Sequence, residues 1–252
     1  MDQALYNDIK ATVGMAGRPQ DDATRSRYTV RCARMDDAHR TLVHNIPFLF
    51  TCDVNEKLIL KQNHSVIIEG DTITAVVPQE TVTPDDYDVV YDAGKRGGVV
   101  VTPGFVNTHA HSHMYLLRSA MMLDEEMTVD DTIKAMGMWQ RGETPESYTY
   151  AAIGDITEQQ KVGITTTLTH GPHFDSGEIA ARLSGQNIVN AVSAVSNSRP
   201  ENNPAMVERL FAERDAYITT PAIALHYLWK TPMDTLREVK RIADRYNALV
   251  TF

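Results

Sequence analysis

The chain has 252 residues, of which 42% are hydrophobic and 23% are charged, so it can bury one large core or two smaller ones. Its 24 Lys and Arg residues against 33 Asp and Glu residues give a net charge of −9, which argues against a nucleic-acid binder. No apolar run approaches the roughly 18 residues of a membrane span, and the start MDQALYNDIK has no apolar signal core. Cys32 and Cys52 are too few and too far apart for a disulfide framework or a thiolate zinc site. We therefore expect a cytoplasmic protein that binds neither nucleic acid nor a membrane.

Residues 1–102 fall into two stretches that differ in their pattern of polar and apolar residues. Residues 1–43 are polar, and the charged stretch GRPQDDATRSR has no apolar period, which predicts a loosely packed polar extension. Residues 44–102 consist of short β-rich runs separated by turn formers. Val66, Ile68 and Ile73 alternate with their neighbours in the two-residue period of half-buried strands, so this stretch predicts a small β-sandwich domain.

Residues 103–252 alternate between apolar strands and helices. The runs GITTTLTH, QNIVNAVSAV, TTPAIALHY and ALVTF indicate buried strands, which implies a parallel sheet of βα units. The pairs Thr144-Pro145, Asn203-Pro204 and Thr231-Pro232 each place a capping side chain before a proline, the start signal of a helix. A complete (β/α)8 barrel takes roughly 250 residues. The predicted fold class is therefore α/β: the N-terminal part of a (β/α)8 TIM-like barrel, with about five strands, preceded by a small β-sandwich domain.

Histidines occur where predicted strands end. His109-Ala110-His111 ends a predicted buried strand that follows a Pro-Gly pair, and His113 comes next. Residues two apart on a strand point to the same side, so both imidazoles are presented at the carboxyl end, where barrel active sites lie. Neutral imidazoles suit zinc and other borderline divalent metals. The pattern predicts a metal site, although a polar strand end with incidental histidines has the same appearance.

The stretch VTPGFVNTHAHSHMYLLRSAM resembles the first barrel strand and first metal motif of the amidohydrolase superfamily, where a β-rich segment is followed by PGxxxxHxH and a barrel. Here PGFVNTHAH occupies residues 103–111, the preceding β-rich stretch resembles the N-terminal composite sandwich, and GITTTLTH resembles the second strand. Within the superfamily, AIALHYLWKTPMDTLREVKRIADRYNALVTF is similar to the chlorohydrolase and methylthioadenosine/adenosylhomocysteine deaminase branch. The resemblance covers about residues 45–252.

The resemblance implies that His109 and His111 bind a metal and that His226, at the end of the fourth strand, reaches toward the substrate unless it is a structural histidine. The strand TTPAIALHY contains no lysine that could bridge two metals, so one divalent metal is implied, zinc first and iron as the alternative. Arg118 could clamp a polar or anionic substrate group or be a surface arginine of a helix. His113, His170 and His173 could also line the pocket. For His170 and His173, the alternative is a structural role in the loop that follows the second strand.

The implied activity is that of a metal-dependent hydrolase, of deaminase or chlorohydrolase type, in which metal-activated water attacks a C–N or C–Cl bond of a nitrogen heterocycle. Hydrolysis of a cyclic or linear amide is the alternative within the superfamily. A non-catalytic fragment or pseudoenzyme that works by association is the alternative outside it.

The resemblance also implies that the catalytic glutamate and the remaining metal ligands come beyond Phe252. Three protein ligands are the usual minimum for catalytic zinc. We therefore expect these residues to be the N-terminal part of a longer enzyme with a small-molecule substrate. We expect this chain to be a homo-oligomer or to be completed by a missing C-terminal portion.

Overall fold

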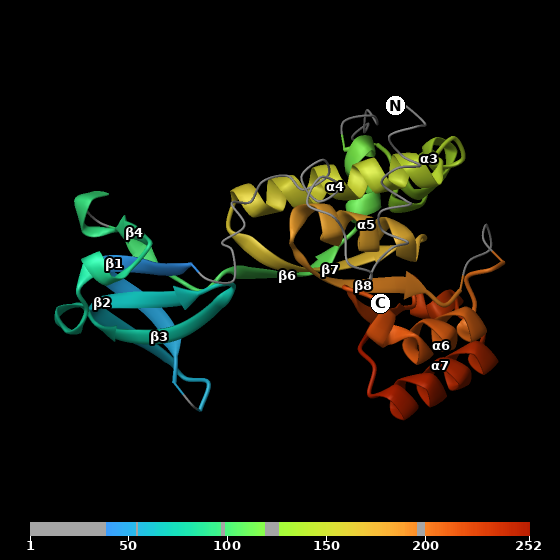
Figure 1. The fold of residues 1–252 in the computed structure, drawn as a ribbon. Coiled ribbons are helices and arrows are strands. Elements are labelled where there is room, and N and C mark those ends of the chain that lie inside the picture. Colours follow the sequence, from blue (N-terminus) through green and yellow to red (C-terminus); the bar gives the residue numbers. More distant parts are fainter. Residues whose placement is uncertain (1–38, 54, 97–98, 119–125, 196–199) are drawn as a thin grey trace, which may run out of the picture. The chain divides into compact units, whose positions relative to one another are not determined.

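The computed structural model describes residues 39–53, 55–96, 99–118, 126–195 and 200–252 (Figure 1). Residues 1–38 of the predicted polar extension lie outside the described residues. The chain divides into two compact units, one ending at Gly104 and the other running from Phe105 to Phe252. Among the described helices, none combines the length and the apolar character needed to span a bilayer.

The first unit is one mixed β-sheet of five strands in the order β3-β2-β1-β4, with β5 also paired to β1. The neighbours β1–β2 and β2–β3 are antiparallel, whereas β4 and β5 run parallel to β1. The strands are β1 (Arg40–Cys52), β2 (Leu58–Glu69), β3 (Thr72–Pro78), β4 (Val89–Asp92) and β5 (Val100–Val101), and the short 3-10 helices are η1 (Gln79–Thr81), η2 (Pro84–Asp86) and η3 (Gly94–Arg96).

Strand β1 begins at Arg40, earlier than the sequence predicts, because its first residues are buried in the core of this unit. Ile46, Leu49 and Val66 form a buried cluster on the sheet. Thr41 and Leu42 are also buried, with exposed fractions of 1% and 0%. Residues 40–43, which the sequence assigned to the polar extension, therefore belong to β1, because burial and pairing with β2 hold them in the sheet.

The second unit is a parallel sheet of five strands in the order β10-β9-β8-β7-β6, with helices between the strands. It confirms the predicted α/β class, with the first strands of a barrel-like sheet following a β-rich unit. The strands are β6 (Phe105–Ala110), β7 (Ile164–Gly171), β8 (Asn187–Ser193), β9 (Thr220–Ala224) and β10 (Val250–Thr251). The helices are α3 (Val129–Gln140), α4 (Pro145–Lys161), α5 (Phe174–Ser184), α6 (Pro204–Ala212) and α7 (Met233–Tyr246), with 3-10 helices η4 (Ser112–Leu117), η5 (Arg214–Ala216) and η6 (Leu228–Lys230).

Helices α4 and α5 lie side by side along β7 and β8, and α6 lies beside α7 next to β9 (Figure 1). Ile156 of α4 and Ile188 of β8 belong to the buried cluster under the first pair, and Val207, Ile223 and Ile242 belong to the cluster under the second. These four helices bury apolar faces against the sheet and thereby hold β7, β8 and β9 in place, so the carboxyl ends of these strands lie along one edge.

Two of the three predicted helix starts are capped as the sequence indicates. The Thr144 hydroxyl accepts a hydrogen bond from the Ser147 backbone N–H, and the Ser147 hydroxyl accepts one from the Thr144 N–H, a reciprocal capping box. Asn203 caps α6 through the Met206 N–H. The third expectation is wrong: α7 begins at Met233 without a side-chain cap, because the Thr231 hydroxyl donates to the carbonyl of residue 227 instead.

The expectation of a buried strand is also wrong for β6. Phe105 and Val106 are 58% and 60% exposed. In the described part of the chain β6 pairs only with β7, so its free side stays open. The neighbouring strands β7, β8 and β9 are largely buried, as predicted.

Candidate active site

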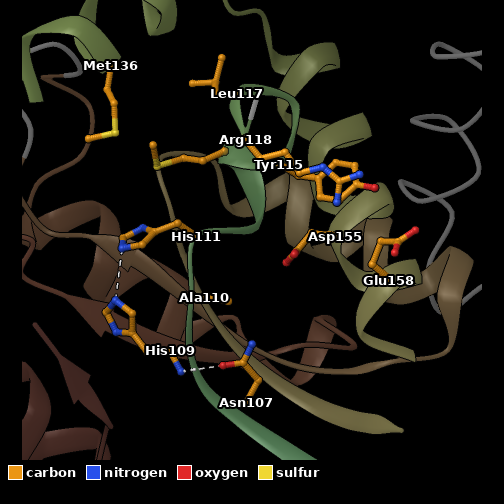
Figure 2. A pocket seen from close by; sticks show the side chains of 11 residues that line it. Asn107, His109, Ala110, His111, Tyr115, Leu117, Arg118, Met136, Asp155 and Glu158 are labelled. Carbon is orange, nitrogen blue, oxygen red and sulfur yellow. Dashed lines mark hydrogen bonds between the residues drawn. The ribbon is translucent and has the colours of Figure 1, made fainter. Parts of the chain in front are cut away.

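The two histidines of the HxH motif converge at the carboxyl end of β6. The strand ends at Ala110, and His111 follows directly. Figure 2 shows both imidazoles on the same side of the chain, with the Nε2 atoms of His109 and His111 only 3.2 Å apart. The two rings meet as the sequence predicts, but His111 lies just past the end of the strand, so alternation along the strand does not by itself account for their approach.

The spacing of these nitrogens can be compared with that of a metal site. Two nitrogens bound about 2.0–2.1 Å from one tetrahedral zinc ion lie roughly 3.3 Å apart. The 3.2 Å separation of the His109 and His111 Nε2 atoms is close to this value, although in the structure the two rings are in hydrogen-bond contact with each other. Within the described ranges, no group of three or more His, Cys, Asp or Glu side chains is arranged to hold a metal, so the pair supplies only part of a ligand set.

Two further histidines surround the pair. The His170 ring, at the end of β7, lies 5.1 Å from the His111 ring, and the His226 ring, just past β9, lies 5.5 Å from it. The His170 and His226 rings are themselves 5.0 Å apart. Parallel strands bring their carboxyl ends to one edge, so histidines that end three different strands meet in one cluster. We call His109, His111, His170 and His226 the imidazole cluster.

A second aromatic group lies beside the imidazole cluster. The His113 ring is 5.8 Å from His111 and 5.6 Å from Tyr148, which in turn is 4.8 Å from His173 at the start of α5. A Cβ atom at position 171 would lie 3.7 Å from His113 Nδ1, an ordinary van der Waals distance, so Gly171 lies directly beside this ring. His113 thus adjoins the cluster directly, while His173 reaches it only through Tyr148.

Burial keeps these imidazoles neutral. Removal from water lowers the pKa of both His113 and His170 to about 3, with a smaller contribution from the neighbouring His111. The pKa values of His111 and His226 are also lowered, again mainly by burial. A neutral imidazole keeps a free lone pair, which is the form that binds a divalent metal.

A cavity of about 540 Å³ opens beside β6 and extends away from the cluster. Arg118 lies in its wall with its guanidinium 4.1 Å above the Tyr115 ring. The pKa of Glu158 is lowered mainly by its hydrogen bond from Lys161, with a small contribution from the charge of Arg118. Figure 2 shows Arg118 directed away from His109 and His111. The cavity is lined by Asn107, His109, Ala110, His111, Met114, Tyr115, Leu117, Arg118, Met136, Asp155 and Glu158.

Sequence reasoning did not single out three of the polar residues in this wall. Asn107 lies inside the PGFVNTHAH motif, two residues before His109, so its position was the available signal. Asp155 and Glu158 look like ordinary charged positions of helix α4, and only the packing of α4 beside β6 places them in the cavity.

Parallel strands with helices between them and histidines gathered at the carboxyl ends of the strands define an α/β protein with a polar site at one edge of its sheet. Residues 100–252 match the amidohydrolase family, and the chain belongs to this family. A 5-methylthioadenosine/S-adenosylhomocysteine deaminase from Thermococcus kodakarensis is 26% identical over 194 residues, which cover 74% of this chain and 43% of the relative.

Solved structures show the same fold. A triazine hydrolase from Arthrobacter aurescens superposes with a TM-score of 0.68 at 17% identity, covering 84% of this chain and 52% of that one. An adenosine deaminase from Xanthomonas campestris, solved with bound zinc, gives a TM-score of 0.66 at 16% identity, covering 83% and 48%. The chain therefore spans about half the length of the proteins that it matches.

Proposed function

We propose that the protein is a metal-dependent hydrolase that acts on a C–N or C–Cl bond of a nitrogen heterocycle, with deamination of a purine-, pyrimidine- or triazine-like ring as the favoured reaction. The observation that carries the proposal is the 3.2 Å approach of the Nε2 atoms of His109 and His111 at the carboxyl end of β6. Two nitrogen ligands at this spacing suit one tetrahedral ion.

His109 and His111 would hold one divalent metal, with zinc favoured over iron because zinc is present in the adenosine deaminase of similar fold. When bound, such an ion acts as a Lewis acid and lowers the pKa of its water toward 7. Three protein ligands are the usual minimum for catalytic zinc, so the pair needs at least one more group. Burial lowers the pKa of the neighbouring His170 to about 3 and keeps its imidazole neutral, so that it does not repel the cation.

His226 is the candidate for contact with the substrate. Its ring is only partly withdrawn from water at the strand end, and it stacks on Tyr227 at 4.2 Å, which fixes the plane of the imidazole. From there an N–H can donate a hydrogen bond to a ring nitrogen or to negative charge that develops on the attacked ring. Trp229 lies 5.2 Å from Tyr227 and is 79% exposed, so this loop presents flat aromatic faces suited to a planar heterocycle.

Arg118, His113, His170 and His173 take secondary parts in the proposal. The Arg118 guanidinium stacks on Tyr115 and points away from the cluster, so it would contact only a substrate group that extends into the cavity beside β6. His170 is buried between His111 and His226 and would support both rings. His113 and His173 would shape the wall behind them.

The substrate class rests on the proteins that the chain resembles. The relative from Thermococcus kodakarensis is named for deamination of two adenosine derivatives, and the two solved structures for a triazine and for adenosine. All these compounds are nitrogen heterocycles with a leaving group on a ring carbon. Chloride release from a chlorotriazine is therefore the second reaction to test.

The experiment compares metal content and turnover in the purified protein and in matched variants. Because the pair is only part of a ligand set, the test uses the protein with its remaining ligands present. There we expect about one zinc per molecule, together with release of ammonia from adenosine or 5-methylthioadenosine, or of chloride from atrazine. The double change His109→Ala/His111→Ala should remove the metal and the turnover. His64→Ala, at a half-buried histidine whose Nδ1 contacts the Gln62 carbonyl oxygen in the other unit, is the control and should keep both. Full metal content in the double variant would refute the proposed site.

A further inference from the structure

We propose that Asn107 is a positioning residue that sets the spacing of His109 and His111 by holding the backbone of His109. The inference rests on the proposed metal site and assigns a support for it. It comes from an irregularity in β6 and from a chain of hydrogen bonds that joins this irregularity to helix α4.

The irregularity lies directly before the metal motif. Asn107 pairs with Thr167 of β7, whereas Ala110 pairs with Thr169, so β6 advances three residues while β7 advances two. One extra residue therefore lies in β6 between Asn107 and Ala110, as in a β-bulge. A bulge takes a residue out of the ladder and re-aims its side chain, and its backbone groups need another partner.

The Asn107 side chain supplies that partner. The backbone N–H of His109 donates to Asn107 Oδ1 at 3.2 Å, a contact that Figure 2 also shows. This side-chain bond to the backbone two residues further on holds the local conformation of the bulge. The direction in which the His109 imidazole leaves the strand, and with it the 3.2 Å spacing to His111, depends on that conformation.

The other end of Asn107 is anchored in the protein interior. Its Nδ2 donates to Gln159 Oε1 at 3.2 Å, and Gln159 is only 7% exposed. The same oxygen accepts the hydroxyl of Thr167 at 2.6 Å, and Gln159 Nε2 donates to Asp155 Oδ2 at 2.6 Å. A carboxylate only accepts, so Asp155 fixes the orientation of the Gln159 amide, which fixes that of Asn107. These hydrogen bonds direct Nδ2 of Asn107 toward Gln159 and leave its Oδ1 facing the backbone of His109.

A second bond secures the chain after the motif. The backbone N–H of Ser112 donates to the Thr169 hydroxyl of β7 at 3.3 Å, and both residues are buried. The metal motif is thus held at both ends by side chains that accept backbone N–H groups. Of these two supports, Asn107 is the one that contacts a proposed metal ligand directly.

The experiment titrates Co²⁺ into the full chain and follows its visible absorption, with Asn107→Ala, Asn107→Asp and Asn190→Ala compared with the wild type. Asn190 is the matched control: it is a buried amide on β8 whose Nδ2 donates to the Phe174 carbonyl, outside the imidazole cluster. We expect Asn107→Ala to weaken Co²⁺ binding about 10–100-fold, the range for groups that orient metal ligands, and to change the spectrum. Asn107→Asp keeps the acceptor for His109 and should recover part of the affinity. Asn190→Ala should match the wild type in both readouts.

Amide hydrogen exchange at His109, measured by NMR on the metal-free chain, separates this inference from the proposed function. Asn107→Ala should speed exchange at His109, and Asn190→Ala should not. Wild-type affinity and spectrum in Asn107→Ala would overturn the positioning role and leave the metal site standing. If the wild-type chain binds no Co²⁺, the ligands that it supplies do not suffice to hold the metal. In that case the exchange rate of the His109 amide tests the positioning role by itself. Faster exchange in Asn107→Ala supports the role, and an unchanged rate overturns it.

Discussion

Gly177 in helix α5 lets the helix approach strand β8, and Gly177→Ala should destabilise the protein. A Cβ atom built at this position would lie 2.5 Å from Nδ2 and 2.6 Å from Cγ of Asn190. These distances are far shorter than any real contact, so the whole Asn190 amide has to move. Asn190 is 2% exposed and donates to the Phe174 carbonyl at 2.8 Å, so moving it breaks a buried hydrogen bond.

The size of the effect follows from three contributions. Leaving a buried amide without its partner costs about 1–3 kcal/mol, and overpacking a filled site costs about 1–3 kcal/mol. Alanine returns about 1 kcal/mol of helix propensity relative to glycine. We therefore expect a net loss of about 1–5 kcal/mol in the free energy of unfolding. At 2–4 °C per kcal/mol for a chain of this size, the melting temperature should fall by about 2–20 °C.

Urea unfolding followed by circular dichroism at 222 nm measures this loss, because all described α-helices lie in the unit that contains Gly177. Gly137→Ala is the matched control: it is also a helix glycine, but nothing lies within 4 Å of its added Cβ, so it should be neutral or stabilising. In the double variant Gly177→Ala/Asn190→Ala the clash is gone, so the two losses should not add. Equal stability of Gly177→Ala and the wild type would refute the close packing of α5 on β8.

Three further changes test other parts of the fold. Ile156→Ala empties a fully buried site under α4 and should cost about 2–5 kcal/mol in urea unfolding, whereas Val162→Ala at a 66% exposed position should stay within about 0.5 kcal/mol. Thr144→Ala removes a helix cap and should cost about 0.5–2 kcal/mol, and a similar loss in Thr231→Ala would contradict the observed start of α7. Two arginines of α7 lower the pKa of Glu208 below its ordinary 4.5, so its contribution to stability is present above that pH and is lost as the pH falls through the lowered pKa. Stability curves of Glu208→Gln and the wild type should therefore differ at pH 7 and converge in acid, and a constant difference at all pH values would exclude the ion pairs as its cause.

Features that depend on neighbouring residues along the chain followed from the sequence. The capping box at Thr144 and the cap at Asn203 join groups three residues apart, so local chemistry is sufficient to predict them. The same signal failed at Thr231, where the hydroxyl found a carbonyl in the preceding turn and a proline took the cap position. A capping motif in the sequence shows that a side chain could cap the helix, but a nearby backbone carbonyl can compete for the same hydroxyl.

Burial of strands required knowledge of their neighbours. The apolar runs of β7, β8 and β9 were correctly predicted as buried, because each has a strand on both sides and helices over it. The run in β6 is just as apolar, yet Phe105 and Val106 are exposed. In the described chain β6 has one paired neighbour, and hydrophobicity along the strand does not reveal which position in the sheet it occupies.

The sequence by itself determined the α/β class and the approximate positions of the strands in the second unit, and its HxH motif placed His109 and His111 together at the end of the first of these strands. Only the tertiary structure decided that His170 and His226 join them, because those residues are brought together by parallel strands far apart in the chain. The support of His109 by Asn107 is likewise a tertiary property. It depends on a register shift between β6 and β7 and on a buried glutamine of α4, and neither leaves a periodic trace in the sequence.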